Sequence, residues 1–260
     1  MITWKTWLSS AVFLVLLVIM AQPTIALDES WVFTPWISHG MGGIEGIDYT
    51  NSWEAFFHNY KRNFRIFEVD LTFSRDQQLV ANHDWSGYAV PPTHDEFMQS
   101  KIKGKFHPMD LHGLIWLLEK FPDISIITDT KETDPKQIRL QFTQLVESVK
   151  HHNPALLDRI IPEIYHPEMY RIVNQIHPFK HQIYSTYMLD AKPEEIIDFM
   201  QNHGLDVIAL SSECVTEDFI HNLREHGISV FVHPINSDKQ QQELKNWGVN
   251  GIYTDFLHPN

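Results

Sequence analysis

Short apolar runs rich in β-branched and aromatic residues alternate along the chain with longer segments of helical periodicity. The runs predicted to be strands are residues 33–38, 64–73, 124–131, 159–165, 181–187, 206–212, 228–235 and 250–256. Amphipathic helices are predicted between them, beginning near Ser52, Asp110, Pro135, Pro167, Pro193, Thr216 and Ser237. This alternation predicts a single-domain α/β fold, a (β/α)8 TIM barrel. An open, doubly wound sheet is the alternative architecture.

Residues 79–108 depart from this alternation. They contain the sequence LVANHDW, followed by a polar segment with Pro and Gly before the next helix. This pattern predicts a long loop with one short strand. A loop that follows the carboxyl end of a barrel strand lies over the active site, where loops carry function.

The first residues have the pattern of a targeting segment. An apolar run at residues 8–21 follows Lys5 and precedes Thr24-Ile25-Ala26. This order predicts a signal peptide, residues 1–26, and therefore an exported protein, extracellular or in the cell envelope. The alternative is an uncleaved anchor that associates with the membrane through residues 8–21. Residues 27–260, about 230 in number, match the usual size of one TIM barrel.

Acidic residues outnumber basic ones by 33 to 20, which gives a formal net charge of −13. Nucleic-acid binding relies on a basic surface, so the sequence excludes a nucleic-acid partner. A phosphate-bearing ligand would need a metal ion or a few well-placed cations. Because Cys214 is the one cysteine, no internal disulfide can form, and we expect this side chain to pack in the interior.

Three acidic residues follow the alternation of two predicted strands. Glu68 and Asp70 are two residues apart, so both point to one face of their strand, and that face is the interior of the barrel. Asp129 ends the next barrel strand, with Lys131 two residues later. Neighbouring buried carboxylates need either a proton or a cation between them. Oxygen ligands of this kind suit one divalent metal, Mg²⁺ or Ca²⁺. Lys131 pairs with these acids or contacts phosphate.

Two of the 16 histidines have positions that favour catalysis. His39 ends the first strand, just before a glycine-rich loop, and His83 lies in the sequence ANHDW. Imidazole groups exchange protons near neutral pH, so a pair of them beside a metal-held phosphodiester can act as base and acid.

These motifs, in this order, resemble those of the glycerophosphodiester phosphodiesterase family, within the wider group of phosphatidylinositol-phospholipase-C-like barrels. The matching segments are Ser38-His39-Gly40, Thr50-Asn51-Ser52, Glu68-Val69-Asp70, His83-Asp84, Asp129-Thr130-Lys131 and residues 248–255. The resemblance spans nearly all of the chain after the predicted signal peptide.

The resemblance implies that His39 and His83 form the acid/base pair, that Glu68, Asp70 and Asp129 bind the metal, and that Lys131 contacts phosphate. Together with the strand-end positions it gives the substrate-binding candidates, which are Lys131, Asn51, Glu163, Trp85 and His233. Glu163 could also be a further metal ligand, and we expect Trp85 and His233 to line the alcohol side of the substrate. Other strand-end residues are expected mainly to pack: Tyr165, Tyr184, Tyr187, Ser211 and Asn236.

The chain differs from the family pattern at two positions. Gly40 stands where the family has Arg, so phosphate would be held mainly by the metal and Lys131. Asp129 stands where the family has Glu, and in this respect the chain resembles sphingomyelinase D and phospholipase D toxins.

The sequence therefore predicts a metal-dependent phosphodiester hydrolase acting on glycerophosphodiesters or phospholipid head groups, small-molecule or lipid. One alternative is a catalytically inert ligand-binding barrel. Another is a phospholipase D-like lyase that forms a cyclic phosphate. A metal-dependent amidohydrolase is disfavoured, because the His-x-His of such barrels is missing from the first strand.

Overall fold

Successive side chains of the strands point to opposite faces, and the two faces are buried against different partners. In the computed structural model, which describes residues 36–187 and 191–259, Phe67 and Val69 pack among the core residues shared with the helices. The alternate strand residues form a separate inner cluster of Ile37, Ile66, Ile127, Ile161, Ile183, Val207, Ala209, Phe231 and Tyr253. Burial on both faces explains why most positions of the strands are apolar.

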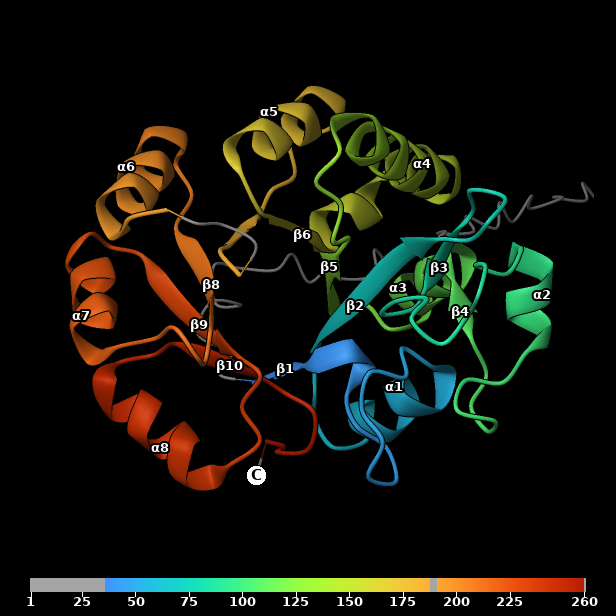
Figure 1. The fold of residues 1–260 in the computed structure, drawn as a ribbon, viewed down its shortest axis with the longest axis horizontal. Coiled ribbons are helices and arrows are strands. Elements are labelled where there is room, and N and C mark those ends of the chain that lie inside the picture. Colours follow the sequence, from blue (N-terminus) through green and yellow to red (C-terminus); the bar gives the residue numbers. More distant parts are fainter. Residues whose placement is uncertain (1–35, 188–190, 260) are drawn as a thin grey trace, which may run out of the picture.

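Parallel strands close into a barrel, seen end-on in Figure 1. In spatial order they are β1 (Trp36–Ser38), β2 (Ile66–Phe73), β5 (Ser125–Asp129), β6 (Ile160–Ile164), β7 (Ile183–Ser185), β8 (Val207–Ser211), β9 (Ser229–His233) and β10 (Gly251–Thr254). The sheet closes because β1 pairs in parallel with both β2 and β10. The predicted (β/α)8 barrel is confirmed, and the open-sheet alternative is wrong.

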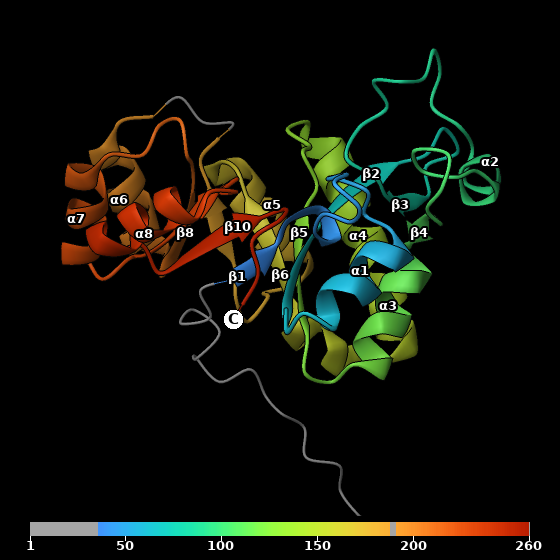
Figure 2. The ribbon, with the colours of Figure 1, turned by 90° about the horizontal axis from the view of Figure 1, so that it is seen from below.

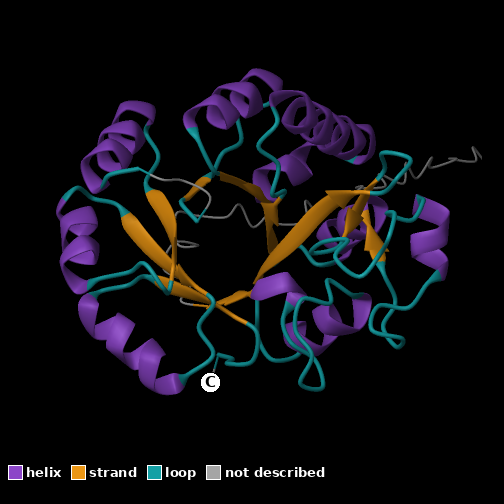
Figure 3. Ribbon diagram, in the orientation of Figure 1, coloured by secondary structure: helices purple, strands orange, loops and turns teal. Residues whose placement is uncertain are grey.

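The helices form a ring outside the strands (Figure 3). They are α1 (Trp53–Tyr60), α3 (Leu111–Lys120), α4 (Pro135–His152), α5 (Pro167–Ile176), α6 (Pro193–His203), α7 (Glu217–Glu225) and α8 (Asp238–Trp247). Each begins within about one residue of its predicted start. The caps explain this agreement: Ser52 accepts a hydrogen bond from the Ala55 N–H at 3.2 Å, and Asp110 accepts one from the Gly113 N–H at 2.9 Å. Short 3₁₀ helices occur at His39–Met41 and Pro154–Arg159.

The segment predicted as a long loop contains more structure than expected. Its strand β3 (Leu79–Ala81) pairs antiparallel with β2, and β4 (Met109–Asp110), which follows it, pairs antiparallel with β3. A short helix, α2 (His94–Gln99), lies between them. Figure 2 shows this insertion on one side of the barrel. The prediction of one short strand is right for β3, whereas α2 and β4 were not predicted.

Several other expectations have clear outcomes. Cys214 is exposed, so the prediction that it packs in the interior is wrong. No helix in the described ranges is long and apolar enough to cross a membrane. The predicted signal peptide, residues 1–26, lies outside the described residues and stays a prediction.

The loop after β1 depends on a close approach at Gly42. The Asn59 side-chain amide donates to the carbonyls of Met41 at 3.1 Å, Gly43 at 3.3 Å and Ala55 at 3.0 Å, and so ties this loop to α1. Gly42 has φ +82°, and a Cβ there would lie 2.4 Å from Asn59 Nδ2. Only glycine combines this backbone conformation with this contact.

We predict that Gly42→Ala lowers the free energy of unfolding by about 2–4 kcal/mol, because it adds steric overlap to backbone strain. Gly46→Ala is the matched control: Gly46 has φ +76° but nothing within 4 Å of the added Cβ. Strain alone should then cost about 1–2 kcal/mol. Urea unfolding measures the free energy of unfolding of both variants. An equal decrease in Gly42→Ala and Gly46→Ala would contradict the close-approach argument.

Candidate active site

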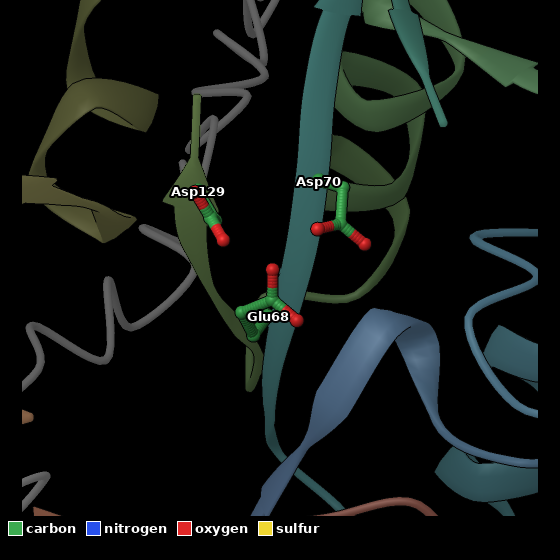
Figure 4. A group of neighbouring side chains, drawn as sticks. All are labelled: Glu68, Asp70 and Asp129. Atoms are coloured by element: carbon green, nitrogen blue, oxygen red, sulfur yellow. The ribbon is translucent and has the colours of Figure 1, made fainter. Parts of the chain in front are cut away.

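Three buried carboxylates meet at the carboxyl end of two neighbouring barrel strands. Glu68 and Asp70 lie on β2 and Asp129 ends β5, and the strand register places Asp70 beside Asp129. One ligand atom from each of the three lies within 4.8 Å of the others. Their residues are 2%, 1% and 8% exposed, so little of their charge is hydrated. Figure 4 shows the grouped side chains, which confirms that the predicted acids come together.

Lys131 neutralises part of this negative charge. Its Nζ atom lies 2.6 Å from Asp70 Oδ1 and 2.7 Å from Asp129 Oδ2. Although burial disfavours the ammonium form, the charges of Asp70 and Asp129 outweigh burial and raise the pKa of Lys131. Of the two roles expected for Lys131, the structure shows the ion pair with the acids.

The three carboxylates differ in how far neighbouring groups offset the cost of burying their negative charge. Burial raises the pKa of Asp129, but the Lys131 ammonium and hydrogen bonds from Tyr165 and Tyr187 outweigh it and hold the pKa below its ordinary value. Burial, followed by the charge of Asp70, raises the pKa of Glu68 well above its ordinary range. Among the described residues, Glu68 is therefore the one acid of the three that is not paired with the Lys131 ammonium.

The oxygen atoms of this cluster fit a hard divalent cation. Glu68 Oε1 is buried and has no hydrogen-bond partner among the described residues. Asp70 Oδ1 likewise accepts no hydrogen bond there, although it faces the Lys131 ammonium. Carboxylate oxygens without competing nitrogen or sulfur ligands are the donors that Mg²⁺ and Ca²⁺ prefer. The cluster can hold one divalent cation.

His39, which follows β1, is held by the carboxylate of Asp255, which follows the neighbouring strand β10. Its Nδ1 lies 3.0 Å from Asp255 Oδ1, and its Nε2 lies 4.0 Å from Glu68 Oε2. Asp255 is fixed in turn by the Asn236 side-chain amide, which donates to Asp255 Oδ2 at 2.6 Å. The imidazole therefore has one nitrogen on a fixed carboxylate and the other directed toward the acidic cluster.

His83 has a similar environment in the insertion. Its Nδ1 lies 2.6 Å from Asp84 Oδ2, and the Ser86 N–H donates to Asp84 Oδ1 at 2.6 Å. The Tyr49 ring contacts both catalytic candidates, with centroid distances of 4.7 Å to His39 and 4.6 Å to His83. The structure thus brings the two predicted histidines to one tyrosine.

A cavity of about 170 Å³ joins these groups. It is lined by His39, Tyr49, Glu68, His83, Asp129, Lys131, Glu163, Tyr187, His233 and Tyr253, and is called the catalytic cavity below.

Glu163 accepts a hydrogen bond from the Tyr253 hydroxyl at 2.7 Å, and burial raises the pKa of Glu163 to about 7. Burial, followed by the charge of His39, lowers the pKa of His233 to about 4. Glu163 and His233 therefore both line the catalytic cavity, and their predicted contacts with substrate stay predictions.

Two of the predicted substrate-binding residues have other contacts. The Asn51 amide donates to Asp70 Oδ2 at 2.7 Å and its carbonyl accepts from the Asp70 N–H at 3.0 Å, so this fully buried residue positions Asp70. The Trp85 indole N–H donates to the Phe73 carbonyl at 2.8 Å, and its ring packs edge-on against Phe97. Neither residue lines the catalytic cavity. Both residues thus have structural contacts, and their predicted role in substrate binding stays a prediction.

Some residues that the sequence analysis did not assign to the site contact its acidic residues or its histidines. Tyr165 and Tyr187, expected to pack, both donate hydrogen bonds to Asp129. Tyr49 carries no motif that would single it out. Gly40, at the position of the family arginine, has φ +55° and donates its N–H to Glu68 Oε2 at 2.6 Å. The backbone of Gly40 thus holds one of the acidic residues.

A closed barrel with its charged groups at the carboxyl ends of the strands is the arrangement of the TIM-barrel enzymes. The Glycerophosphoryl diester phosphodiesterase family matches residues 45–258, and the chain belongs to this family of phosphodiesterases. The sequence-based resemblance is thereby confirmed.

Similarity to individual proteins agrees with this assignment. The glycerophosphodiester phosphodiesterase of Bacillus subtilis (strain 168) is 22% identical over 223 residues, which cover 74% of this chain and 73% of that protein. A crystal structure of a glycerophosphodiester phosphodiesterase from Parabacteroides distasonis ATCC 8503 has a TM-score of 0.70 at 20% identity, covering 85% of this chain and 92% of that one. An Oleispira antarctica phosphodiesterase, in complex with the product sn-glycerol-3-phosphate, has a TM-score of 0.71 at 14% identity, covering 85% and 93%. At these identities, the solved structures support the fold.

We predict that Glu163→Gln stabilises the protein at high pH. A pKa near 7 in the folded state, against an ordinary value of 4.5, means that the folded chain binds more protons than the unfolded chain between these values. The contribution of Glu163 to stability is therefore fully present below pH 4.5 and is lost as the pH rises to about 7. Relative to wild type, Glu163→Gln should gain up to about 3 kcal/mol between pH 5 and pH 8.

Urea unfolding in the presence of a chelator measures this gain without a contribution from bound cations. Glu119→Gln, which removes an exposed carboxylate on α3, is the control and should show little pH dependence relative to wild type. A constant difference between Glu163→Gln and wild type across this pH range would contradict the raised pKa.

Proposed function

We propose that the protein hydrolyses glycerophosphodiesters to sn-glycerol 3-phosphate and an alcohol, using one divalent cation and two histidines as base and acid. The observation that carries the proposal is that His39 and His83, each with Nδ1 on its own carboxylate, face one cavity whose wall includes the acidic cluster. Family membership and the product complex of the Oleispira antarctica phosphodiesterase support the reaction type and the glycerol phosphate half of the substrate.

His39 is suited to remove the proton from the attacking water. If Nδ1–H donates to Asp255, the lone pair of Nε2 faces the catalytic cavity and can accept a proton. The Asp255 carboxylate then stabilises the imidazolium that forms, as the carboxylate of a catalytic triad does. Asn236 keeps Asp255 in place during this exchange, because it donates to the carboxylate oxygen that His39 does not use.

His83 is suited to protonate the leaving oxygen. When the ring carries a proton on each nitrogen, Nδ1–H donates to Asp84 and Nε2–H is the donor available to the leaving oxygen. The side chain of His83 is 38% exposed, against 12% for His39, so it can recover a proton from solvent after each turnover. The two imidazoles thus have different access to water as well as different carboxylates.

The cation site and Lys131 would hold the phosphate. We propose that Glu68, Asp70 and Asp129 bind one Mg²⁺ or Ca²⁺. The chemistry that such a cation supplies is charge that offsets the negative phosphate oxygens. Lys131 supplies a second positive group at the same wall of the cavity, where the sequence lacks the family arginine. The inert-barrel alternative has no need of two histidines that are each paired with a carboxylate.

The proposal predicts that wild-type protein converts glycerophosphoethanolamine to glycerol 3-phosphate and ethanolamine in the presence of Mg²⁺ or Ca²⁺. His39→Ala and His83→Ala should each lower kcat by roughly 10²- to 10⁴-fold, because proton transfer loses its base or its acid. Phosphorus NMR follows substrate and product directly, and circular dichroism verifies the fold of each variant.

His151→Ala is the matched control, since His151 is an exposed histidine on α4, and it should retain wild-type turnover. Normal turnover in either catalytic variant would contradict the acid/base pair. Accumulation of a cyclic phosphate would show that a substrate hydroxyl, rather than water, attacks phosphorus. If wild-type protein releases no product with either cation, the hydrolase proposal fails.

A further inference from the structure

A second cavity adjoins the catalytic cavity and shares two residues with it. This cavity, of about 330 Å³, lies mainly within the insertion, and Tyr49 and His83 line both cavities. The remaining lining residues are Asp48, Asn82, Asp84, Ser86, Gly87, Tyr88, Phe97, Lys101, Ile102 and Lys103. We call it the insertion cavity. A molecule whose phosphate lies beside His83 can therefore extend into either space.

The position of His83 decides which half of the substrate extends into the insertion cavity. The acid of the proposed reaction contacts the oxygen of the departing alcohol, so that alcohol lies on the side of His83. His39 lines the catalytic cavity and is not among the residues that line the insertion cavity. The glycerol phosphate half then remains in the catalytic cavity, and the departing alcohol lies in the insertion cavity.

The charges around the insertion cavity indicate what this alcohol carries. Although the chain has a net charge of −13, residues 101–105 read Lys-Ile-Lys-Gly-Lys. Lys105 pairs with Glu45, outside the cavity. Lys101 and Lys103 line the cavity and form no ion pair within the described part of the chain. Two unpaired ammonium groups at one cavity favour an anionic ligand.

The backbone holds these lysines in place. Lys103 and Gly104 have φ +51° and φ +70°, and the Lys105 N–H donates to the Ile102 carbonyl at 3.1 Å, which makes a tight turn. Ile102 pairs with Phe106, which is buried. The turn is therefore anchored at its base, and it carries both lysines at the wall of the cavity.

The acidic residues of the cavity do not cancel this preference. Asp84 is already bound to His83 and Ser86. Asp48 is half-buried and forms no ion pair among the described residues, so it can receive a cationic group. Phe97 and Tyr88 add apolar surface to the wall. The cavity thus offers two free positive groups and one free negative group.

We propose, on the basis of the proposed function, that the insertion cavity is a subsite for a departing alcohol that carries an anionic substituent, such as a carboxylate. In the reaction, water forms the new bond to phosphorus and gives its proton to His39. The ester bond to the alcohol breaks, and the alcohol oxygen takes a proton from His83. Lys101 and Lys103 bind the anionic substituent in the substrate and contribute specificity without taking part in proton transfer.

Two substrates that differ by one carboxylate test this subsite directly. Glycerophosphoserine and glycerophosphoethanolamine have the same scissile bond and the same amine, so the ratio of their kcat/KM values reports the carboxylate alone. Wild-type protein should prefer glycerophosphoserine by about 3- to 10-fold, the range expected for two partly exposed ion pairs. The preference should lie mostly in KM and should decrease at high salt, which screens exposed charges.

The double variant Lys101→Gln/Lys103→Gln should bring this ratio to about 1, whereas the matched control Lys105→Gln should keep the wild-type ratio. Equal kcat/KM for the two substrates in wild-type protein would overturn the subsite and leave the hydrolase proposal intact. An unchanged ratio in the double variant would overturn the role of the two lysines. If wild-type protein hydrolyses neither substrate, the proposed function itself fails.

Discussion

The ammonium group of Lys131 lies between two buried carboxylates, Asp70 and Asp129, while the third carboxylate, Glu68, forms no ion pair with a lysine or arginine among the described residues. Burying charged groups without compensation is costly, and this constraint shapes the whole mouth of the barrel. Tyr165 and Tyr187 donate to Asp129 on one side. Even so, the pKa of Glu68 stays well above its ordinary range, because burial and the charges of Asp70 and Asp129 outweigh the charge of Lys131. The site is therefore arranged around an excess of negative charge that a divalent cation would relieve.

The fold brings residues that follow distant strands of the sequence to the same end of the barrel as this cluster. The turn after β1 supplies His39, the chain after β10 supplies Asp255, and the insertion after β2 supplies His83. The two imidazoles resemble each other in having a carboxylate partner but differ in exposure, and the proposed roles of His39 as base and His83 as acid rest on this difference. Tyr49 contacts both rings and lines both the catalytic cavity and the insertion cavity.

Local patterns in the sequence were sufficient for the barrel and for its acids. Alternation along β2 places Glu68 and Asp70 on the inner face, and helix caps such as Ser52 fix where helices begin. The same patterns could not predict the role of a residue whose contacts lie far away in the sequence. Asn51 matches a family motif, but only the structure shows that its amide is used by Asp70. Tyr49 follows no periodic pattern, and its role depends on two histidines that lie elsewhere in the chain. The helix α2 had a local signal, the capping box of Thr93 and Glu96, which the prediction of a loop passed over.

Isothermal titration calorimetry of chelator-stripped protein with Mg²⁺ and with Ca²⁺ tests the central claim most directly. The cluster of Glu68, Asp70 and Asp129 predicts one bound cation per chain. It also predicts that Asp70→Asn weakens binding by at least about tenfold, because a ligand charge is lost. Glu163→Gln, which neutralises a buried acid outside the cluster, should bind the cation with little change in affinity. Failure of wild-type protein to bind either cation, or unchanged affinity in Asp70→Asn, would contradict the account.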